Sequence, residues 1–154
     1  MAHESVIENA RKTGAILNAL LNGVDQAAST ATRDGDDGWT TLKVVCHLRD
    51  FELIWQERVG LIVSQEQPQL PGFDVAGLVI RNDYINQNFA EILAERNALR
   101  ADSLALLARL DEATWERTGI HPVRGEMSVI ALGQQLATHD IDHLEQIARV
   151  LGKV

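Results

Sequence analysis

The chain has 154 residues and a formal net charge of −8, and 45% of its residues are hydrophobic and 23% charged. This composition is typical of a globular protein with one hydrophobic core, and it excludes a disordered chain. The 14 Lys and Arg residues are scattered, whereas binding to nucleic acid needs a concentrated basic face. We therefore expect a single domain over residues 1–154 that does not bind nucleic acid.

Cysteine content and apolar runs limit the class of protein further. Cys46 is the one cysteine, so neither an internal disulfide nor a cysteine-based zinc framework can form. The N-terminal residues lack the pattern of a signal peptide, and no apolar run approaches the roughly 20 residues that span a bilayer. These features predict a cytoplasmic protein with no membrane partner.

Four long segments have the apolar spacing of amphipathic helices, and they predict an all-α four-helix bundle. In chain order, we predict helices at residues 4–28, from Thr40 or Thr41 to Ser64, at 86–110 and at 129–150. A loop at 29–38 follows the first helix, and a long crossover with a short helix at 74–85 joins the second to the third. A mixed connection at 111–127 holds one helical turn near 113–115, and Ser128 caps the last helix. Because no segment alternates strongly with period two, we expect no sheet.

Two histidines share the apolar face of the last helix. His139 and His143 are four residues apart, and they continue a line of apolar side chains formed by Leu132, Leu136, Ile147 and Val150. Both imidazoles are therefore predicted to point into the core. The acidic residues between them, Asp140 and Asp142, are predicted to be rotated away from it.

The second helix carries one more inward histidine. Val44, His47, Phe51 and Ile54 form one line on that helix, so His47 can converge with the histidine pair. Burial of imidazoles with unsatisfied nitrogens is costly, and a shared metal ion would satisfy all three lone pairs. The alternative is that each is a core histidine bonded to a carbonyl. Three protein ligands would leave a position open, which is typical of catalytic sites.

Spacing excludes three related sites. A metalloprotease helix needs His-Glu-x-x-His, but residue 140 is Asp and the third histidine lies far upstream. A di-iron bundle needs two Glu-x-x-His motifs, and neither is present. Haem ligation by opposed histidines is disfavoured because His139 and His143 lie on one side of their helix.

Several other residues have two interpretations. Asp50 and Asp142 are each placed to orient a ligand histidine through its second ring nitrogen, and Asp50 is the stronger candidate. We interpret Cys46 as a packed thiol, Trp55 and Trp115 as core residues, His121 as a surface loop histidine and Arg58 as a surface arginine. The alternative for Arg58 is binding of an anionic substrate group, and Arg81 and Tyr84 could line a pocket. No residue is identified as a general base, so the catalytic residues stay unknown.

Three segments resemble the DinB-like (DinB/YfiT-type) superfamily of metal-binding four-helix bundles. They are GWTTLKVVCHLRDFE at residues 38–52, TGIHPVRGEMSV at 118–129 and HDIDHLEQI at 139–147. The resemblance implies a bundle with a long crossover between helices two and three, and metal ligation by His47, His139 and His143. It also implies nickel, zinc, iron or manganese as the metal, a homodimer, and, in some members, reactions with bacillithiol, mycothiol or glutathione.

Our leading hypothesis is therefore a metal-dependent thiol S-transferase that binds one divalent ion, zinc or nickel first and iron or manganese next. Its partners would be a low-molecular-weight thiol and a small-molecule substrate. A metal-bound thiol is deprotonated and becomes a nucleophile near neutral pH. The alternatives are a non-enzymatic metal-binding protein with a stress or interaction role and, more weakly, a metal-dependent hydrolase.

Overall fold

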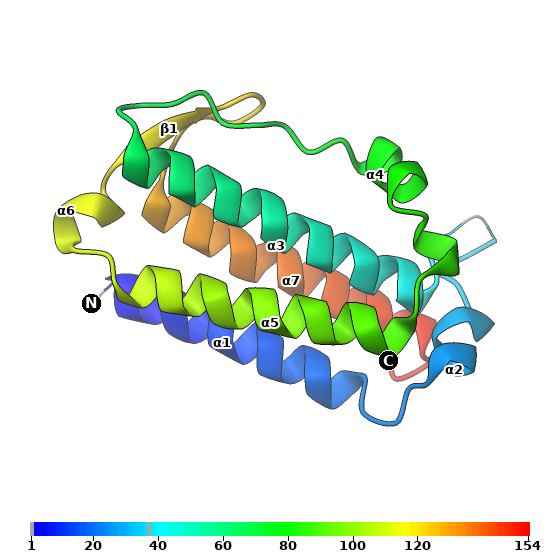
Figure 1. Ribbon diagram of the computed structural model, residues 1–154. Helices are drawn as coiled ribbons and strands as arrows, with labels where there is room; N and C mark the ends of the chain where they lie inside the picture. The colour runs from blue at the N-terminus through cyan, green and yellow to red at the C-terminus, as the bar shows by residue number, and fades with distance from the viewer. Residues whose placement is uncertain (1, 37) are drawn as a thin grey trace.

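Four long helices form the body of the protein (Figure 1). They are α1 (Ala2–Leu20), α3 (Thr41–Ser64), α5 (Phe89–Ala108) and α7 (Val129–Val150). The computed structural model describes residues 2–36 and 38–154. Met1 and Asp37, which the predicted domain and the predicted loop at 29–38 include, lie outside the described residues. The predicted four-helix bundle is confirmed.

The direction of the helices explains the crossover. In Figure 1, α1 and α7 run one way and α3 and α5 run the other way. Contacts join α1 to α7, α7 to α3, α3 to α5 and α5 to α1. Because α3 and α5 are parallel neighbours, the chain must return along the bundle between them. This return contains the helix α4 (Val75–Arg81) and the 3-10 helix η1 (Tyr84–Asn86), which confirms the predicted crossover.

Capping residues set several helix ends. Thr40 caps α3 by accepting a hydrogen bond from the backbone N–H of Lys43, and Ser128 caps α7 in the same way through Ala131, as predicted. The predicted first helix, residues 4–28, is too long. Gly23 has a φ of 79° and interrupts it, and Asp25 then caps the separate helix α2 (Gln26–Ala31). The predicted loop at 29–38 therefore begins inside a helix.

The prediction that the chain has no sheet is wrong. Strands β1 (Thr118–His121) and β2 (Gly125–Ser128) form an antiparallel hairpin after the helical turn α6 (Glu112–Trp115). Four-residue strands are too short for alternation to stand out in a sequence. Ile120 also exchanges two backbone hydrogen bonds with the crossover, donating to the carbonyl of Pro68 and accepting from the N–H of Leu70. The hairpin and the crossover are thus joined above one end of the bundle.

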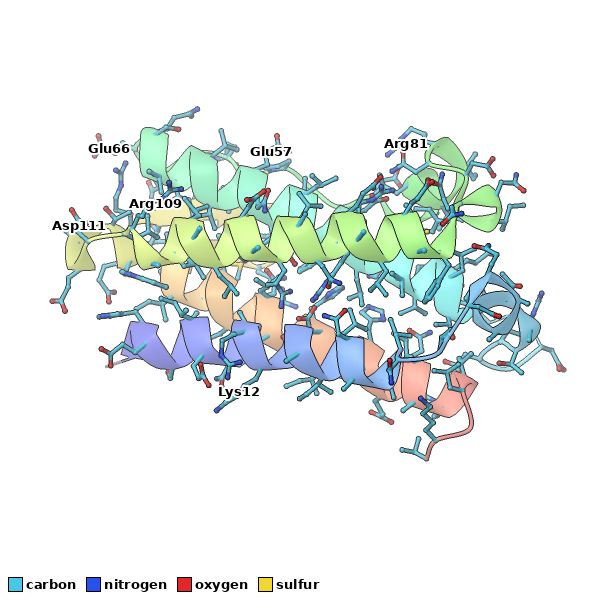
Figure 2. All side chains as sticks on the ribbon, turned by 60° about the horizontal axis from the view of Figure 1, so that its bottom comes forward. Lys12, Glu57, Glu66, Arg81, Arg109 and Asp111 are labelled. Carbon is cyan, nitrogen blue, oxygen red and sulfur yellow. The ribbon has the colours of Figure 1, made fainter. Side chains whose placement is uncertain are left out.

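Apolar residues fill the bundle in two clusters. A polar layer lies between them, at the middle of the four long helices, and includes the buried residues Thr13, His47, Glu52, Arg96, Arg100 and Asp140. One cluster contains Trp55 and Trp115, and the other contains Cys46, so the predicted burial of all three is confirmed. Charged side chains such as Lys12, Glu57 and Arg81 project outward (Figure 2). No helix in residues 2–36 and 38–154 is long and apolar enough to cross a membrane.

Candidate metal centre

The three predicted histidines converge in the polar layer. His47 from α3 and His139 and His143 from α7 each offer a ring nitrogen, and these nitrogens all lie within 4.8 Å of one another. The Nε2 atoms of His47 and His139 are 2.9 Å apart. The four-residue spacing on α7 brings the two α7 rings to a centroid distance of 4.5 Å. The structure therefore brings together every ligand candidate that the sequence identified.

Aromatic side chains hold these imidazoles from the sides. Phe51 stacks on His139, and Phe73 from the crossover contacts the rings of both His47 and Phe51. Trp39, just before α3, lies edge-on to His47. Because these rings are bulky and largely apolar, they limit both the rotation and the hydration of the two histidines.

Burial keeps two of the histidines neutral. It lowers the pKa of His47 to about 3 and the pKa of His139 to about 2, and the charge of His143 acts in the same direction. Neutral imidazole is the form that binds metal, so both lone pairs are available at neutral pH. The Nδ1 atoms of both rings are buried and without a hydrogen-bond partner among the described residues. A cluster of three facing imidazole nitrogens fits one divalent metal ion.

The contacts that orient the histidines differ from the expected ones. His143 donates from Nδ1 to the side-chain oxygen of Gln146 at 2.8 Å, a contact that the sequence analysis missed although the two residues are one turn apart. Asp50 instead accepts hydrogen bonds from Tyr84, Asn82 and Arg49, and none from the Nδ1 of His47. Its carboxylate ties α3 to the crossover.

A cavity of about 290 Å³ opens beside the histidines. It lies between the crossover, the hairpin and the helices α3 and α7, and His47, Phe51 and His139 form part of its wall. Its other polar lining residues are Arg58, His121, Arg124 and Gln135. None of the described residues that line this cavity is Asp or Glu. A small molecule in the cavity would therefore meet two of the candidate ligands, His47 and His139, and a positively charged wall.

Two residues that line the cavity were interpreted from the sequence as surface residues, and both interpretations are wrong. Arg58, interpreted as a surface arginine, is 1% exposed, and His121, interpreted as a surface loop histidine, is 8% exposed. Tertiary contacts bury both, because the crossover covers Arg58 and the hairpin turns His121 toward the bundle. Arg81 and Tyr84, the two crossover residues considered as pocket-lining candidates, do not line this cavity. Tyr84 is buried against Asp50, while Arg81 pairs with Asp74 in a neighbouring cavity.

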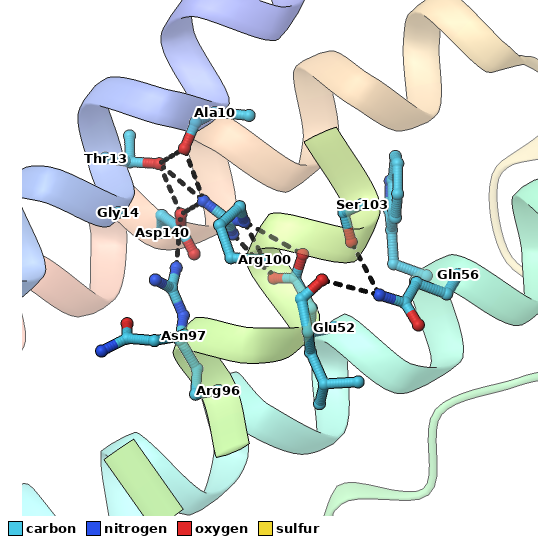
Figure 3. Close-up of polar contacts among 12 residues, drawn as sticks. Ala10, Thr13, Gly14, Glu52, Gln56, Arg96, Asn97, Arg100, Ser103 and Asp140 are labelled. Carbon is cyan, nitrogen blue, oxygen red and sulfur yellow. Dashed lines mark hydrogen bonds and ion pairs between the residues drawn. The ribbon is translucent and has the colours of Figure 1, made fainter. Parts of the chain in front are cut away.

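The prediction that Asp140 is rotated away from the core is also wrong. It is 3% exposed and accepts hydrogen bonds from Arg96, Arg100 and Thr13 (Figure 3). Arg100 in turn binds Glu52 through Nε and Nη2. The reason is that α7 packs against both α1 and α3, so it buries a wider face than one apolar stripe. Asp142 is exposed, as expected.

Comparison with known proteins identifies the family. The family model described as the DinB superfamily matches residues 10–147. The chain belongs to the DinB superfamily. This membership confirms the family that the three sequence segments resemble.

The relatives found by the comparison are described as metal-dependent proteins. A Bacillus subtilis protein named "Putative metal-dependent hydrolase YfiT" is 29% identical over 132 residues, covering 83% of this chain and 73% of its own. A protein from Oceanobacillus iheyensis with the same description is 28% identical and covers 88% of this chain and 75% of its own. The solved structure of Bacillus subtilis YfiT is described as a four-helix bundle of unusual topology. It matches with a TM-score of 0.82 and 25% identity, covering 97% of this chain and 87% of that one.

Proposed function

We propose that this protein is a metal-dependent enzyme that transfers a low-molecular-weight thiol to a small electrophilic substrate. The observation that carries the proposal is the cavity beside His47 and His139, whose described lining residues include no carboxylate. His47, His139 and His143 would hold one divalent ion, zinc or nickel first. When bound, this ion supplies Lewis acidity that lowers the pKa of a thiol or of water.

The lining of the cavity favours a thiol over water as the nucleophile. Hydrolysis at such sites is usually assisted by a carboxylate that takes a proton from water. A thiol has a pKa near 8.5 and needs much less help to lose its proton. In the proposed reaction the sulfur forms a bond to an electrophilic carbon. The leaving group departs with its electron pair, and the thiol proton passes to solvent.

The protein's own residues would position the reactants. The flat face of Phe51 and the ring of Phe73 offer an apolar surface next to His47 and His139, suited to the carbon skeleton of a substrate. Arg58 and Arg124 give the cavity a positive potential, which favours a thiolate over its neutral thiol.

Hydrolysis is the second candidate, because the relatives from Bacillus subtilis and Oceanobacillus iheyensis are described as metal-dependent hydrolases. An adjoining cavity contains Asp142 together with His139 and Arg124. Asp142 is exposed and is the carboxylate that we would test as a base for this reaction.

The test compares the two reactions in one protein. Zinc-loaded and nickel-loaded protein is assayed with bacillithiol, mycothiol and glutathione against 1-chloro-2,4-dinitrobenzene, with chloride as the leaving group. We expect metal-dependent turnover with at least one thiol, and its loss in His139→Ala. No turnover with any thiol would refute the proposal. Ester hydrolysis that needs the metal and is lost in Asp142→Asn would support the second candidate instead.

A further inference from the structure

Arg58 is a buried cation without an acidic partner. Its Nε and Nη2 atoms both donate to the carbonyl of Pro71, at 3.0 and 2.9 Å, and its side chain forms no ion pair with any residue in 2–36 or 38–154. A neutral carbonyl does not compensate a full charge, and a buried charge without a counter-ion is costly. Burial lowers the pKa of Arg58, and the charge of Glu57 opposes this shift from a side chain that projects outward in Figure 2. The guanidinium lines the cavity with Nη1 uncommitted.

His121 presents a second uncommitted donor. Its Nδ1 accepts from the backbone N–H groups of Val123 and Arg124, at 3.1 and 3.2 Å. The proton of the neutral ring is therefore on Nε2. Across the described part of the chain, no hydrogen bond from this N–H is formed, although the side chain is only 8% exposed and lines the cavity. The turn of the hairpin thus holds a ring donor in a defined orientation.

Arg124 adds a third positive group at the same place. It follows His121 in the hairpin turn, lines the cavity, and its guanidinium has no hydrogen bond or ion pair with the residues that the structure describes. Electrostatic repulsion links the three groups, because the charges of Arg58 and Arg124 both act on His121 and that of Arg124 acts on Arg58. Two separate elements, α3 and the hairpin, therefore bring hydrogen-bond donors without partners to the same wall of the cavity, and two of these donors are positively charged.

We propose that Arg58, His121 and Arg124 form an oxyanion-binding subsite beside the histidine cluster. Its ligand is a carboxylate or phosphate group carried by the thiol or by the substrate. Arg58 and His121 each offer an N–H to one oxygen, and Arg124 adds charge at the mouth of the cavity. The assignment of this group to a reactant rests on the proposed function, whereas anion binding itself does not.

The structural role of Arg58 does not account for the whole arrangement. Its contact with Pro71 anchors the crossover, but a neutral hydrogen-bonding side chain would do this without a buried charge. Neither His121 Nε2 nor the guanidinium of Arg124 takes part in that anchor. An anion in the cavity would satisfy all three groups together.

The test measures anion binding in the metal-free protein, so that coordination to a metal does not contribute. Succinate, its uncharged dimethyl ester and inorganic phosphate are titrated at constant ionic strength, and the Nε2–H of His121 is followed by NMR. We expect a saturable shift with succinate or phosphate and none with the ester. A response to only one of the two anions identifies the group as carboxylate or phosphate.

Variants locate the subsite. Arg124→Gln changes an exposed side chain without partners among the described residues and should fold normally, and we expect it to weaken anion binding on the order of tenfold, as for loss of one nearby positive charge. Arg58→Met should weaken it further, and Arg58→Lys should restore part of it. The matched control is Arg81→Gln, since Arg81 is an exposed arginine outside this cavity, and it should leave binding unchanged.

Three outcomes would be decisive. Absence of anion binding, or equal weakening by Arg124→Gln and Arg81→Gln, would overturn the subsite. Anion binding without turnover for any thiol would leave the subsite in place and refute the proposed function. Anion binding together with turnover that is as fast with 2-mercaptoethanol as with mercaptoacetate, and unchanged in Arg124→Gln, would support thiol transfer and refute the assignment of the anionic group to the thiol.

Discussion

Phe51 lies flat against the imidazole of His139, with ring centroids 3.7 Å apart and an angle of 18° between the planes. Phe51 is one turn after His47 on α3, so the helix that supplies one candidate ligand also clamps the ring of another. The Nδ1 of His139 has no hydrogen-bond partner among the described residues. On the Nδ1 side, packing against Phe51 rather than a hydrogen bond therefore sets the orientation of this ring.

Replacing Phe51 by Leu should loosen the candidate metal centre. Leucine keeps much of the apolar volume but lacks the flat face, so we expect a loss of about 1 kcal/mol in unfolding free energy. We also expect metal affinity to fall by about tenfold or more, as for other changes that disturb ligand orientation. Competition with a chelating dye and urea unfolding measure the two effects. Phe89→Leu, in the second apolar cluster and without a ring contact to any of the three histidines among the described residues, is the control: it should lower stability without changing metal affinity.

Metal content tests the ligand assignment directly. Elemental analysis of untagged protein should give about one metal per chain, because one cluster of three imidazoles forms one site. His139→Ala should remove the metal, since two ligands remain. His121→Ala, which changes another buried histidine of the same cavity, should retain it. Full occupancy in His139→Ala would refute the assignment.

Asp140 and Asp142 allow a matched test of the buried ionic network, which consists of Asp140, Arg96, Arg100 and Glu52. Asp140→Asn leaves Arg96 and part of Arg100 without a counter-charge in the core, so we expect a loss of about 3–5 kcal/mol in unfolding free energy. Asp142→Asn, on the exposed side of the same helix, should change stability by less than about 0.5 kcal/mol. Urea unfolding of both variants measures this difference, and similar values for the two would contradict a stabilising role of the network.

The thiol of Cys46 should be inert in the folded protein. It is fully buried, and burial raises its pKa from 9.0 to about 12. At pH 8 its thiolate fraction is therefore about a thousandfold below that of an exposed thiol, in addition to the steric protection. We expect a disulfide reagent such as dithionitrobenzoate to react only after denaturant is added. Rapid reaction with the native protein would show that α3 opens locally.

The stability of the metal-free protein should fall in mild acid. His47 and His139 have folded-state pKa values of about 3 and about 2, below the ordinary value of 6.5. Below pH 6.5 the unfolded chain therefore binds protons at these residues that the folded chain does not. The stability is fully present above pH 6.5 and decreases as the pH falls toward 3, by up to about 1.4 kcal/mol per pH unit for each histidine. Urea unfolding between pH 7 and pH 5 measures this slope, and His47→Gln should make it shallower.

The sequence by itself determined the four long helices and the histidines that they direct inward. Both results depend on local periodicity: a residue's helical face follows from its spacing, so His139 and His143 could be placed on one apolar stripe and His47 on another. Caps such as Thr40 and Ser128 are equally local, because a side chain meets a backbone N–H three residues away.

Only the tertiary structure decided which side chains surround the histidines. Asp140 is buried because α7 has two neighbouring helices, and Arg58 and His121 are buried because the crossover and a short hairpin fold over them. These contacts join residues far apart in the chain, and no periodicity encodes them. The sequence therefore predicts a cluster of metal ligands, whereas the positive cavity beside it follows only from the way the connections pack on the bundle.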